Sequence, residues 1–247
     1  MRYKGKTYLI AGGSSGIGLA TARLLAKEGA GVVLVSGNEE KLSNALAGLD
    51  CGEKYAVCCD LGNPENVGTI FAQLQDKGIV LDGMVYCAGI APLCLLKDNT
   101  QELMTEVFSV NLFSFIEMSR YFYQETCAHN GSRIVAVSSI TAHGAGYRQT
   151  LYGASKAAMV SAVKLMSKEL MNRDIRINCI SPGVVDTPIL EELRAASPGL
   201  EENLKKNQIL GVIPPEAVAS AIVHMLGEGS DYRTGTEQIL DGGAMLK

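Results

Sequence analysis

The chain has 247 residues, of which 47% are hydrophobic and 19% are charged, a composition typical of a globular protein. Its formal net charge is −4 and it has no run of basic residues, so binding to nucleic acid or to an anionic membrane is not expected. The longest uncharged stretch, residues 83–96, has 14 residues and contains Pro92, which is short for a membrane span and indicates buried core.

Seven short apolar runs predict β-strands in chain order. They are residues 8–11, 32–35, 55–59, 83–88, 133–137, 175–180 and 237–240. The runs are continuous rather than alternating, as expected for strands buried on both faces. Helical patterns lie between them, at 17–29, 63–78, 100–127 and 152–171. Asn63 and Pro64 suit the N-cap and first position of the second of these helices.

This alternation predicts an α/β fold of the doubly wound (Rossmann) type, with a mostly parallel seven-stranded sheet and helices on both faces. No repeat, linker or change in composition divides the chain, so a single domain covering residues 1–247 is expected. The least regular region, residues 187–215, contains four prolines and two glycines. It predicts a helical flap over the substrate rather than a second domain.

The cysteines and histidines argue against disulfides and metals. The seven cysteines are scattered, form no C-x-x-C pair and lie mostly in apolar segments, which favours reduced thiols and a cytoplasmic location. The three histidines have no ligand-like spacing with them, so no metal site is expected. No segment resembles a signal peptide.

A glycine-rich loop, A-G-G-S-S-G-I-G at residues 11–18, joins the first predicted strand to the first helix. Gly12, Gly16 and Gly18 allow positive φ and let a phosphate approach the backbone. The helix N-terminus adds free N–H groups and the positive end of the helix dipole. The loop therefore predicts binding of a dinucleotide pyrophosphate, and the alternative is a tight turn without a ligand.

Further motifs follow in order along almost the whole chain. They are C-D-L (59–61), Y-C-A-G (86–89), Asn111, V-S-S-I (137–140), Y-G-A-S-K (152–156), N-C-I-S-P-G-V-V-D-T (178–187) and T-G-T-E-Q-I-L-D-G-G (234–243). Together with the glycine loop, they make the chain resemble the short-chain dehydrogenase/reductase family, in particular single-domain members such as 3-oxoacyl-[acyl-carrier-protein] reductase-like enzymes. The resemblance implies an NAD(P)-dependent oxidoreductase that interconverts a secondary alcohol and a ketone by hydride transfer.

Four residues match the catalytic positions of that family: Asn111, Ser139, Tyr152 and Lys156. Tyr152 would exchange a proton with the substrate oxygen, which Ser139 would hold. Lys156 lies one helical turn after Tyr152, and a charge about 4 Å away at an effective dielectric of ~20 is worth ~4 kcal/mol, or ~3 pKa units. We therefore expect the pKa of Tyr152 to fall toward neutrality. Asn111 would fix a water in a proton relay through Lys156.

Each of these residues also has a structural interpretation. Tyr152 and Lys156 could form the edge of an amphipathic helix. Ser139 could satisfy backbone groups at a strand end. Asn111 could be a buried helix kink. The shared motif context favours the catalytic interpretation for all four.

The resemblance also implies a set of cofactor-binding residues. They are Gly12, Ser14, Ser15, Gly16, Ile17, Gly18, Ser36, Asn38, Asp60, Leu61, Ala88, Gly89, Tyr152, Lys156, Pro182, Gly183, Val185 and Thr187. Thr187 would bind the nicotinamide carboxamide, or cap a helix that begins at Pro188, or both. Asp60 would contact the adenine or hold a turn. His143 and Arg148 could face the substrate, although a surface-loop position is favoured.

The end of the second strand bears on the choice of cofactor. An acidic residue there binds the ribose hydroxyls and repels a 2′-phosphate. Ser36 occupies this position, and Glu39 and Glu40 suit the first turn of the following helix instead. Ser36 and Asn38 could hydrogen-bond a phosphate, although no Arg or Lys accompanies them. We expect NADP(H), with NAD(H) as the alternative.

The chain departs from the family pattern at two places. Ala11 stands where the glycine motif usually has threonine, and Tyr86 and Cys87 replace two asparagines. These positions are mainly structural and support the cofactor, so the departures bear on cofactor affinity and local rigidity and leave catalysis possible.

The expected partners are a small carbonyl or alcohol substrate and further copies of the chain. The substrate could be a ketoacyl thioester, a sugar or polyol, a steroid or a small ketone. In relatives, the helices that hold Asn111 and Tyr152 form a subunit interface, which suggests a homotetramer or a homodimer. The alternative functions are a non-catalytic nucleotide-sensing or scaffold protein on the same fold, and a sugar-nucleotide epimerase or dehydratase. The last is disfavoured because such enzymes usually add a C-terminal substrate domain.

Overall fold

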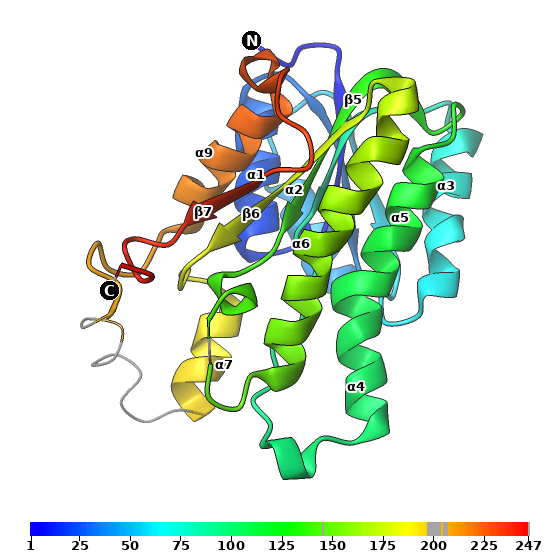
Figure 1. Ribbon diagram of the computed structural model, residues 1–247. Helices are drawn as coiled ribbons and strands as arrows, with labels where there is room; N and C mark the ends of the chain where they lie inside the picture. The colour runs from blue at the N-terminus through cyan, green and yellow to red at the C-terminus, as the bar shows by residue number, and fades with distance from the viewer. Residues whose placement is uncertain (145, 197–203, 205–206, 247) are drawn as a thin grey trace.

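The computed structural model describes residues 1–144, 146–196, 204 and 207–246 (Figure 1). Its seven parallel strands form one sheet in the order β3-β2-β1-β4-β5-β6-β7. Their bounds are β1 Thr7–Ala11, β2 Gly31–Ser36, β3 Lys54–Cys58, β4 Leu81–Tyr86, β5 Ala128–Val137, β6 Arg176–Pro182 and β7 Glu237–Leu240. The predicted fold class and all seven predicted strands are confirmed. Strands β2 and β3 are added on one side of β1, and β4 to β7 on its other side, so the strand order reverses between β1 and β4. Open α/β sheets bind ligands at such a point, at the carboxyl ends of their strands.

Helices cover both faces of the sheet. Their bounds are α1 Gly16–Lys27, α2 Glu39–Ala47, α3 Val67–Asp76, α4 Gln101–Phe108, α5 Ser114–Phe122, α6 Thr150–Leu170, α7 Pro188–Ala196 and α9 Pro215–Leu226. One face packs against α3, α5 and α6, and the other against α1, α2 and α9 (Figure 1). Among the described residues, no helix has the length and apolar character that a membrane crossing requires.

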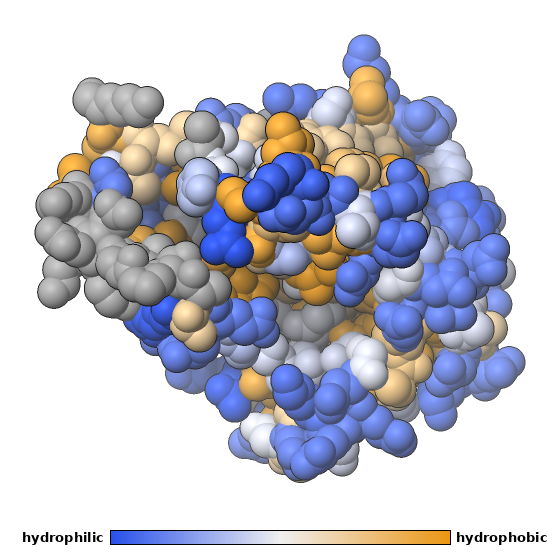
Figure 2. All heavy atoms as spheres, turned by 90° about the horizontal axis from the view of Figure 1, so that it is seen from below, coloured by the Kyte–Doolittle hydropathy of each residue, from blue (hydrophilic) through white to orange (hydrophobic). Residues whose placement is uncertain are grey.

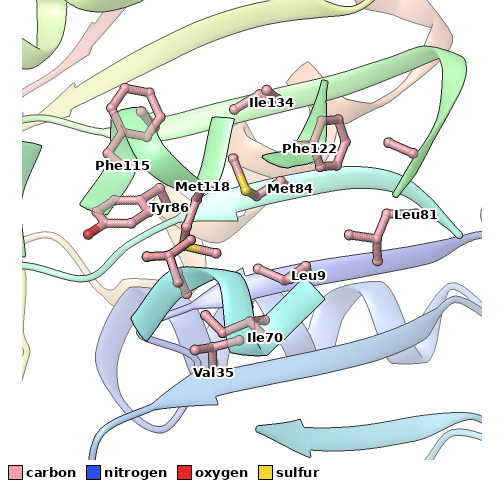
Figure 3. Packing of buried hydrophobic residues seen from close by; sticks show 14 of the residues in the cluster. Leu9, Val35, Ile70, Leu81, Met84, Tyr86, Phe115, Met118, Phe122 and Ile134 are labelled. Atoms are coloured by element: carbon pink, nitrogen blue, oxygen red, sulfur yellow. The ribbon is translucent and has the colours of Figure 1, made fainter. Parts of the chain in front are cut away.

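The core lies on both sides of the sheet because successive strand residues point to opposite faces. In β1, Leu9 packs on the α3–α5–α6 side, and Tyr8 and Ile10 pack on the α1–α2–α9 side. Figure 3 shows the first cluster, in which Phe115 and Phe122 lie against the strands and are completely buried. Burial of each such side chain contributes roughly 1.5–3 kcal/mol, which explains why the strands are continuous apolar runs.

The segment predicted as one long helix at 100–127 is two helices joined by a π-helical turn. Residues Ser109–Phe113 form this turn between α4 and α5, with Asn111 in the middle. Such a turn inserts one extra residue into the helical hydrogen-bond pattern and often occurs at functional sites. Asn111 is therefore buried in an irregular turn of the helix, which corresponds to the structural interpretation considered for it.

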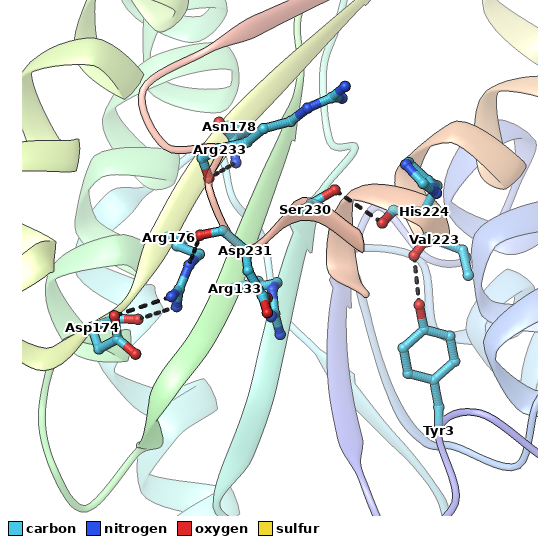
Figure 4. A network of polar contacts seen from close by, with 10 residues as sticks. All are labelled: Tyr3, Arg133, Asp174, Arg176, Asn178, Val223, His224, Ser230, Asp231 and Arg233. Atoms are coloured by element: carbon cyan, nitrogen blue, oxygen red, sulfur yellow. Dashed lines mark hydrogen bonds and ion pairs between the residues drawn. The ribbon is translucent and has the colours of Figure 1, made fainter. Parts of the chain in front are cut away.

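Polar contacts hold the amino-terminal end of the sheet together (Figure 4). Arg176 Nε donates to the Asp231 carbonyl oxygen over 2.6 Å, and Asn178 Nδ2 donates to the Arg233 carbonyl oxygen over 3.0 Å. Nearby, Tyr3 Oη donates to the Val223 carbonyl oxygen over 2.6 Å. These bonds fix the connection from α9 to the edge strand β7 and leave the carboxyl ends of the strands open.

The expected flap at 187–215 is described in part. α7 begins at Pro188, directly after Thr187, so Thr187 takes the N-cap position, while its hydroxyl donates to the Val185 carbonyl oxygen over 3.4 Å. Residues 197–203, 205 and 206 of the flap lie outside the described residues. The buried Gln208 joins the described end to β6, because its Oε1 accepts from the Val184 N–H over 2.8 Å and its Nε2 donates to the Val184 carbonyl oxygen over 3.0 Å.

Candidate active site

The glycine loop after β1 is packed so closely that side chains do not fit. Gly12 has φ +76, and a Cβ there would lie 2.7 Å from the Ala88 nitrogen. A Cβ on Gly18 would lie only 2.1 Å from the Gly12 carbonyl oxygen. Glycine at both positions therefore lets the loop pack backbone against backbone at the end of β4.

The start of α1 fits a phosphate group. Ser15, at the N-cap, has extended backbone with φ −158 and makes no side-chain cap hydrogen bond. The first N–H groups of a helix have no partner within the helix, so an uncapped start leaves them available to an anion. A Cβ on Gly16 would lie 3.1 Å from Thr187 Cγ2, so Thr187 adjoins this loop. The residues present thus fit a dinucleotide pyrophosphate.

The ends of β2 and β3 lie side by side, with Ser36 paired to Cys58. Ser14 Oγ donates to Ser36 Oγ over 2.9 Å. Asn38 caps α2, since its Oδ1 accepts from the Lys41 N–H over 2.8 Å, and Glu39 and Glu40 follow in the first helical turn. The side chain at the end of β2 is therefore the hydroxyl of Ser36, and the nearby carboxylates of Glu39 and Glu40 belong to α2.

Two other predicted cofactor residues follow β3. Asp60 Oδ1 accepts from the Gly62 N–H over 2.8 Å, which is the turn contact considered for this residue. Leu61 is buried in the core, and its carbonyl oxygen accepts from Ser114 Oγ over 2.7 Å. Both residues lie outside the cavity described next, on the side of the sheet where β2 and β3 end.

A cavity of about 580 Å³ opens at the carboxyl ends of β4, β5 and β6. Figure 2 shows this face of the molecule, where apolar side chains gather around a central recess and polar residues surround them. The predicted site residues that line the cavity are Ile17, Gly89, Ser139, Tyr152, Lys156, Pro182, Gly183, Val185 and Thr187. The structure therefore brings together three of the four predicted catalytic residues with the central part of the predicted cofactor site.

The side chain of Lys156 on α6 is buried and hydrogen-bonded to the sheet. Its Nζ donates to the Val137 carbonyl oxygen over 2.8 Å, and Ser138 Oγ donates to the Lys156 carbonyl oxygen over 3.1 Å. Burial, which penalises the ammonium ion, lowers the pKa of Lys156 to about 8. The lysine is 3% exposed, so this charge is poorly solvated.

The pKa of Tyr152 does not fall as expected. Burial raises it above its ordinary value, and a hydrogen bond with Ser139 opposes the rise only in part. Lys156 Nζ lies 5.9 Å from the centre of the Tyr152 ring and is bonded to Val137. The expectation assumed a fully charged lysine about 4 Å from the phenol. Burial destabilises the charged forms of both side chains, the ionised phenol and the ammonium ion. The ligand-free site thus holds a protonated tyrosine.

Ser139 combines its two interpretations. Its Oγ accepts from the Thr141 N–H over 3.1 Å and lies 2.8 Å from Thr141 Oγ1, at the start of the 3₁₀ turn Ile140–Ala142. The same side chain lines the cavity, and its interaction with Tyr152 lowers the pKa of that phenol. The local turn thus fixes the serine beside the tyrosine.

Asn111 lies behind the cavity, and both the oxygen and the nitrogen of its side-chain amide are hydrogen-bonded. Its Oδ1 accepts from the Ile90 N–H over 2.9 Å, and its Nδ2 donates to the Ile90 carbonyl oxygen over 3.0 Å and to Ser155 Oγ over 2.9 Å. A Cβ on Gly89 would lie 3.2 Å from Asn111 Oδ1 and 3.3 Å from Lys156 Nζ. The π-helical turn therefore holds the loop after β4 against α6.

Comparison with known proteins gives a consistent family. Residues 11–245 match the family model described as Enoyl-(Acyl carrier protein) reductase. The chain is 31% identical to Carbonyl reductase family member 4 of Xenopus laevis over 242 residues, 98% of each chain, and 31% identical to 3-oxoacyl-[acyl-carrier-protein] reductase FabG of Thermotoga maritima over 100% of each. The chain belongs to the short-chain dehydrogenase/reductase family. It is an oxidoreductase acting on CH–OH groups, with the nucleotide-binding Rossmann fold of that family.

Solved structures agree with this assignment. A short-chain dehydrogenase/reductase from Serratia marcescens superimposes with a TM-score of 0.88 at 25% identity, covering 99% of each chain. A 4-hydroxyisoleucine dehydrogenase complexed with NADH superimposes with a TM-score of 0.90 at 27% identity, covering 98% of this chain and 99% of that chain. The fold and length of this short-chain dehydrogenase/reductase thus match those of its relatives throughout.

The replacement of two family asparagines by Tyr86 and Cys87 has a structural consequence in this short-chain dehydrogenase/reductase. Tyr86 Oη donates to the Val110 carbonyl oxygen over 2.5 Å, and its ring packs 5.3 Å from that of Phe115. Cys87 lines the cavity, and burial raises the pKa of its thiol to about 12. Tyr86 therefore ties β4 to the π-helical turn, while the neutral Cys87 thiol adds no charge to the site.

Several residues around the cavity differ from what the sequence predicted. His143, for which a surface position was favoured, lines the cavity. Arg148 does not; its φ is +64 and its Nη2 donates to the Leu93 carbonyl oxygen over 3.1 Å. The apolar wall from α7 lies in the predicted flap, but its residues were not named individually; they are Ile189, Leu190 and Leu193. Its only signal was the helical spacing of these residues after Pro188. Within the described residues, no group of three or more His, Cys, Asp or Glu could hold a metal.

Proposed function

We propose that this chain interconverts a secondary alcohol and a ketone with a nicotinamide dinucleotide, and that Tyr152 exchanges the proton. When bound, the cofactor supplies or accepts the hydride. The observation that carries the proposal is the arrangement of Ser139, Tyr152 and Lys156 around one cavity next to an uncapped helix start. The cavity suits a small-molecule carbonyl or alcohol.

The three side chains take different roles. Ser139 holds the substrate oxygen by a hydrogen bond, and Tyr152 delivers its proton to that oxygen during reduction. The raised pKa of Tyr152 keeps the phenol protonated near neutral pH, which favours the reducing direction. Lys156, with a pKa of about 8, can return a proton to the phenol from within α6.

Asn111 acts through position in this proposal. Both hydrogens of its amide and the Oδ1 atom already have protein partners, so the side chain is not free to bind a relay water. It holds Ile90 and Ser155 instead, and thereby fixes the distance between the loop after β4 and α6. This replaces the direct relay role expected for the side chain.

The glycine loop would hold the pyrophosphate through Gly12, Ser14, Ser15, Gly16 and Gly18. Ile17, Gly89, Pro182, Gly183, Val185 and Thr187 would surround the nicotinamide, and Ser36, Asn38, Asp60, Leu61 and Ala88 would complete the adenosine side. We expect NADP(H) to be preferred over NAD(H), because a serine hydroxyl rather than a carboxylate ends β2. Comparison of kcat/KM for NADPH and NADH tests this, and a large preference for NADH would contradict it.

The exposed face of α5 and α6 supports self-association. The exposed fractions are 48% for Phe113, next to α5, 39% for Ile116 and 68% for Leu165. Apolar side chains exposed on packed helices suit an interface between subunits, so we expect a homotetramer or homodimer. Sedimentation as a monomer at micromolar concentration would reject this. The free cysteines suit a cytoplasmic location, which fractionation of the source cells would test.

The decisive test is Tyr152→Phe against a panel of ketones and secondary alcohols, with the absorbance of the nicotinamide cofactor followed. 

The amount of cofactor oxidised or reduced is the measured quantity. Removal of the phenol hydroxyl should lower kcat by about 10³-fold with the best substrate, within the range that a positioned acid or base contributes. The dissociation constant of the cofactor should stay nearly unchanged. Unchanged kcat would refute the role of Tyr152, and cofactor binding without turnover of any panel member would favour the nucleotide-sensing alternative.

A further inference from the structure

His143 is held on the cavity wall by a carboxylate from a distant strand. His143 Nε2 lies 2.6 Å from Glu237 Oε1, and the two residues are 94 positions apart in the chain. Glu237 is the first residue of β7, and its side chain is only 10% exposed. The pair therefore joins the loop after β5 to the edge of the sheet beside the cavity.

The hydrogen bonds around Glu237 determine which nitrogen of His143 carries the proton. The buried Ser181 hydroxyl donates to the same Glu237 Oε1 atom. An oxygen that accepts from serine and faces the imidazole acts as a carboxylate acceptor, so Nε2 must donate. In the neutral ring Nδ1 is then an acceptor. No described residue hydrogen-bonds Nδ1.

The two sides of the cavity differ in polarity around this ring. The loop after β5 contributes the polar side, with Thr141, His143 and Gln149. α7 contributes the apolar side, with Ile189, Leu190 and Leu193. His143 follows Ser139 by four residues across a 3₁₀ turn, which places the two Cα atoms roughly 8 Å apart at about 2.0 Å rise per residue. One small molecule can therefore reach both side chains.

We propose that Nδ1 of His143 accepts a hydrogen bond from a hydroxyl group of the substrate, so that the chain prefers hydroxy ketones and the matching diols over plain ketones. The hydroxyl lies one to three carbons from the carbonyl that Ser139 and Tyr152 hold, and the alkyl part faces α7. Glu237 is a positioning residue, since it acts by fixing the tautomer of His143. This inference deepens the proposed function and rests on it.

The first test compares two ketones that differ only in the hydroxyl group, 4-hydroxy-2-butanone and 2-butanone. The wild-type chain should reduce the hydroxy ketone with a kcat/KM about tenfold higher, which is the effect of about one hydrogen bond. His143→Phe fills similar space without an acceptor and should remove this preference while leaving kcat/KM for 2-butanone nearly unchanged. Equal loss with both ketones would overturn the proposal, as would a wild-type chain without any preference.

Two further variants separate recognition from folding. Glu237→Gln keeps the shape of the side chain but frees the tautomer of His143, so the preference should fall while turnover of 2-butanone persists. His143→Gln offers another acceptor and should restore part of the preference. A Glu237→Gln variant with the full wild-type preference would contradict the role of Glu237.

A binding experiment distinguishes this inference from the proposed function. The chain has only three histidines, so the ring signals of His143 can be assigned by NMR with the His143→Phe variant as reference. Addition of 4-hydroxy-2-butanone with cofactor to Tyr152→Phe protein should shift the His143 signals more than addition of 2-butanone does. If the wild-type chain turns over 2-butanone but the NMR shifts do not differ between the two ketones, the inference alone is overturned. If the wild-type chain turns over no ketone, the proposed function is rejected.

Discussion

The cofactor side and the substrate side of the site differ in whether backbone or side chains form them. The cofactor side, after β1 and β4, is built from backbone: Gly12 and Gly18 leave no room for a Cβ, and the start of α1 carries no side-chain cap. The substrate side, after β5, is built from side chains fixed by hydrogen bonds, such as Ser139 and Lys156. The first side should therefore be damaged by adding atoms, and the second by removing functional groups.

The largest effect is expected from an added methyl group on the cofactor side. Gly18→Ala would place a Cβ 2.1 Å from the Gly12 carbonyl oxygen, so the backbone of the loop must move. We expect the free energy of unfolding to fall by at least about 3 kcal/mol, the upper part of the range for overpacking, with loss of measurable cofactor binding. Denaturant unfolding and cofactor titration check this.

Gly48→Ala is the matched control. Its nearest neighbour would be 3.6 Å away, an ordinary contact at the end of α2, so stability should change by no more than about 0.5 kcal/mol. Similar losses in both variants would show that the glycine loop has no special packing.

The next effect comes from removing a hydroxyl on the substrate side. Ser139→Ala should lower kcat by about 10²-fold, since one donor to the reacting oxygen contributes this much. Ser167→Ala is the control, because Ser167 Oγ donates to the Lys164 carbonyl oxygen over 2.8 Å and does not line the cavity. It should reduce stability by about 1 kcal/mol and kcat only slightly. Equal effects of the two substitutions on kcat would contradict the assignment.

Substitution of Lys156 should have a smaller effect on stability, and it should raise stability while it lowers activity. Its pKa is lowered from 10.5 to about 8 in the folded chain, which corresponds to a cost of ~3 kcal/mol when both states are protonated, below pH 8. Lys156→Met removes this cost and the bond to Val137, so the ligand-free protein should gain ~2 kcal/mol of stability while activity is lost.

The pH dependence of that gain follows from the sign of the shift. Above pH 8 the folded chain releases the lysine proton before the unfolded chain does, so wild-type stability rises with pH toward 10.5. The difference in thermal unfolding between variant and wild type should therefore be largest below pH 8 and shrink as the pH approaches 10.5. A difference independent of pH would show that the lysine is not buried as a charge.

The smallest effect is expected at the end of β2. Ser36→Asp places a carboxylate where a 2′-phosphate would lie and breaks the bond to Ser14. The ratio of kcat/KM for NADPH to that for NADH should fall by about tenfold, equal to about 1.4 kcal/mol. Ser43→Asp, on the exposed side of α2, controls for added charge and should leave the ratio unchanged. An unchanged ratio in Ser36→Asp would remove the argument for NADP(H).

Local patterns predicted much of the fold and of the cofactor side. Continuous apolar runs identified every strand of the sheet, and the glycine loop was located because its role depends on neighbouring residues in the chain. The pair Tyr152 and Lys156 was found in the same way, since four residues make one helical turn. These features could be predicted because the residues that form each of them are neighbours in the sequence.

The rest depended on contacts between distant segments. The partner of His143 is Glu237, which only the order of strands brings beside it. The direction of the Tyr152 pKa shift depends on how deeply the phenol itself is buried, and spacing in the sequence does not reveal burial. The π-helical turn at Asn111 likewise follows from bonds to Ile90 and Ser155, not from a propensity of the turn's own residues.

The exchange of bonds between β5 and α6 has a mechanical consequence. Lys156 Nζ donates to the Val137 carbonyl oxygen, and the next residue, Ser138, donates back to the Lys156 carbonyl oxygen. A single bond would act as a pivot, whereas two antiparallel bonds resist rotation as well as separation. Ser139 and Tyr152, attached on either side of this brace, therefore move as one rigid body, and the distance that a proton must cross is set before any substrate arrives.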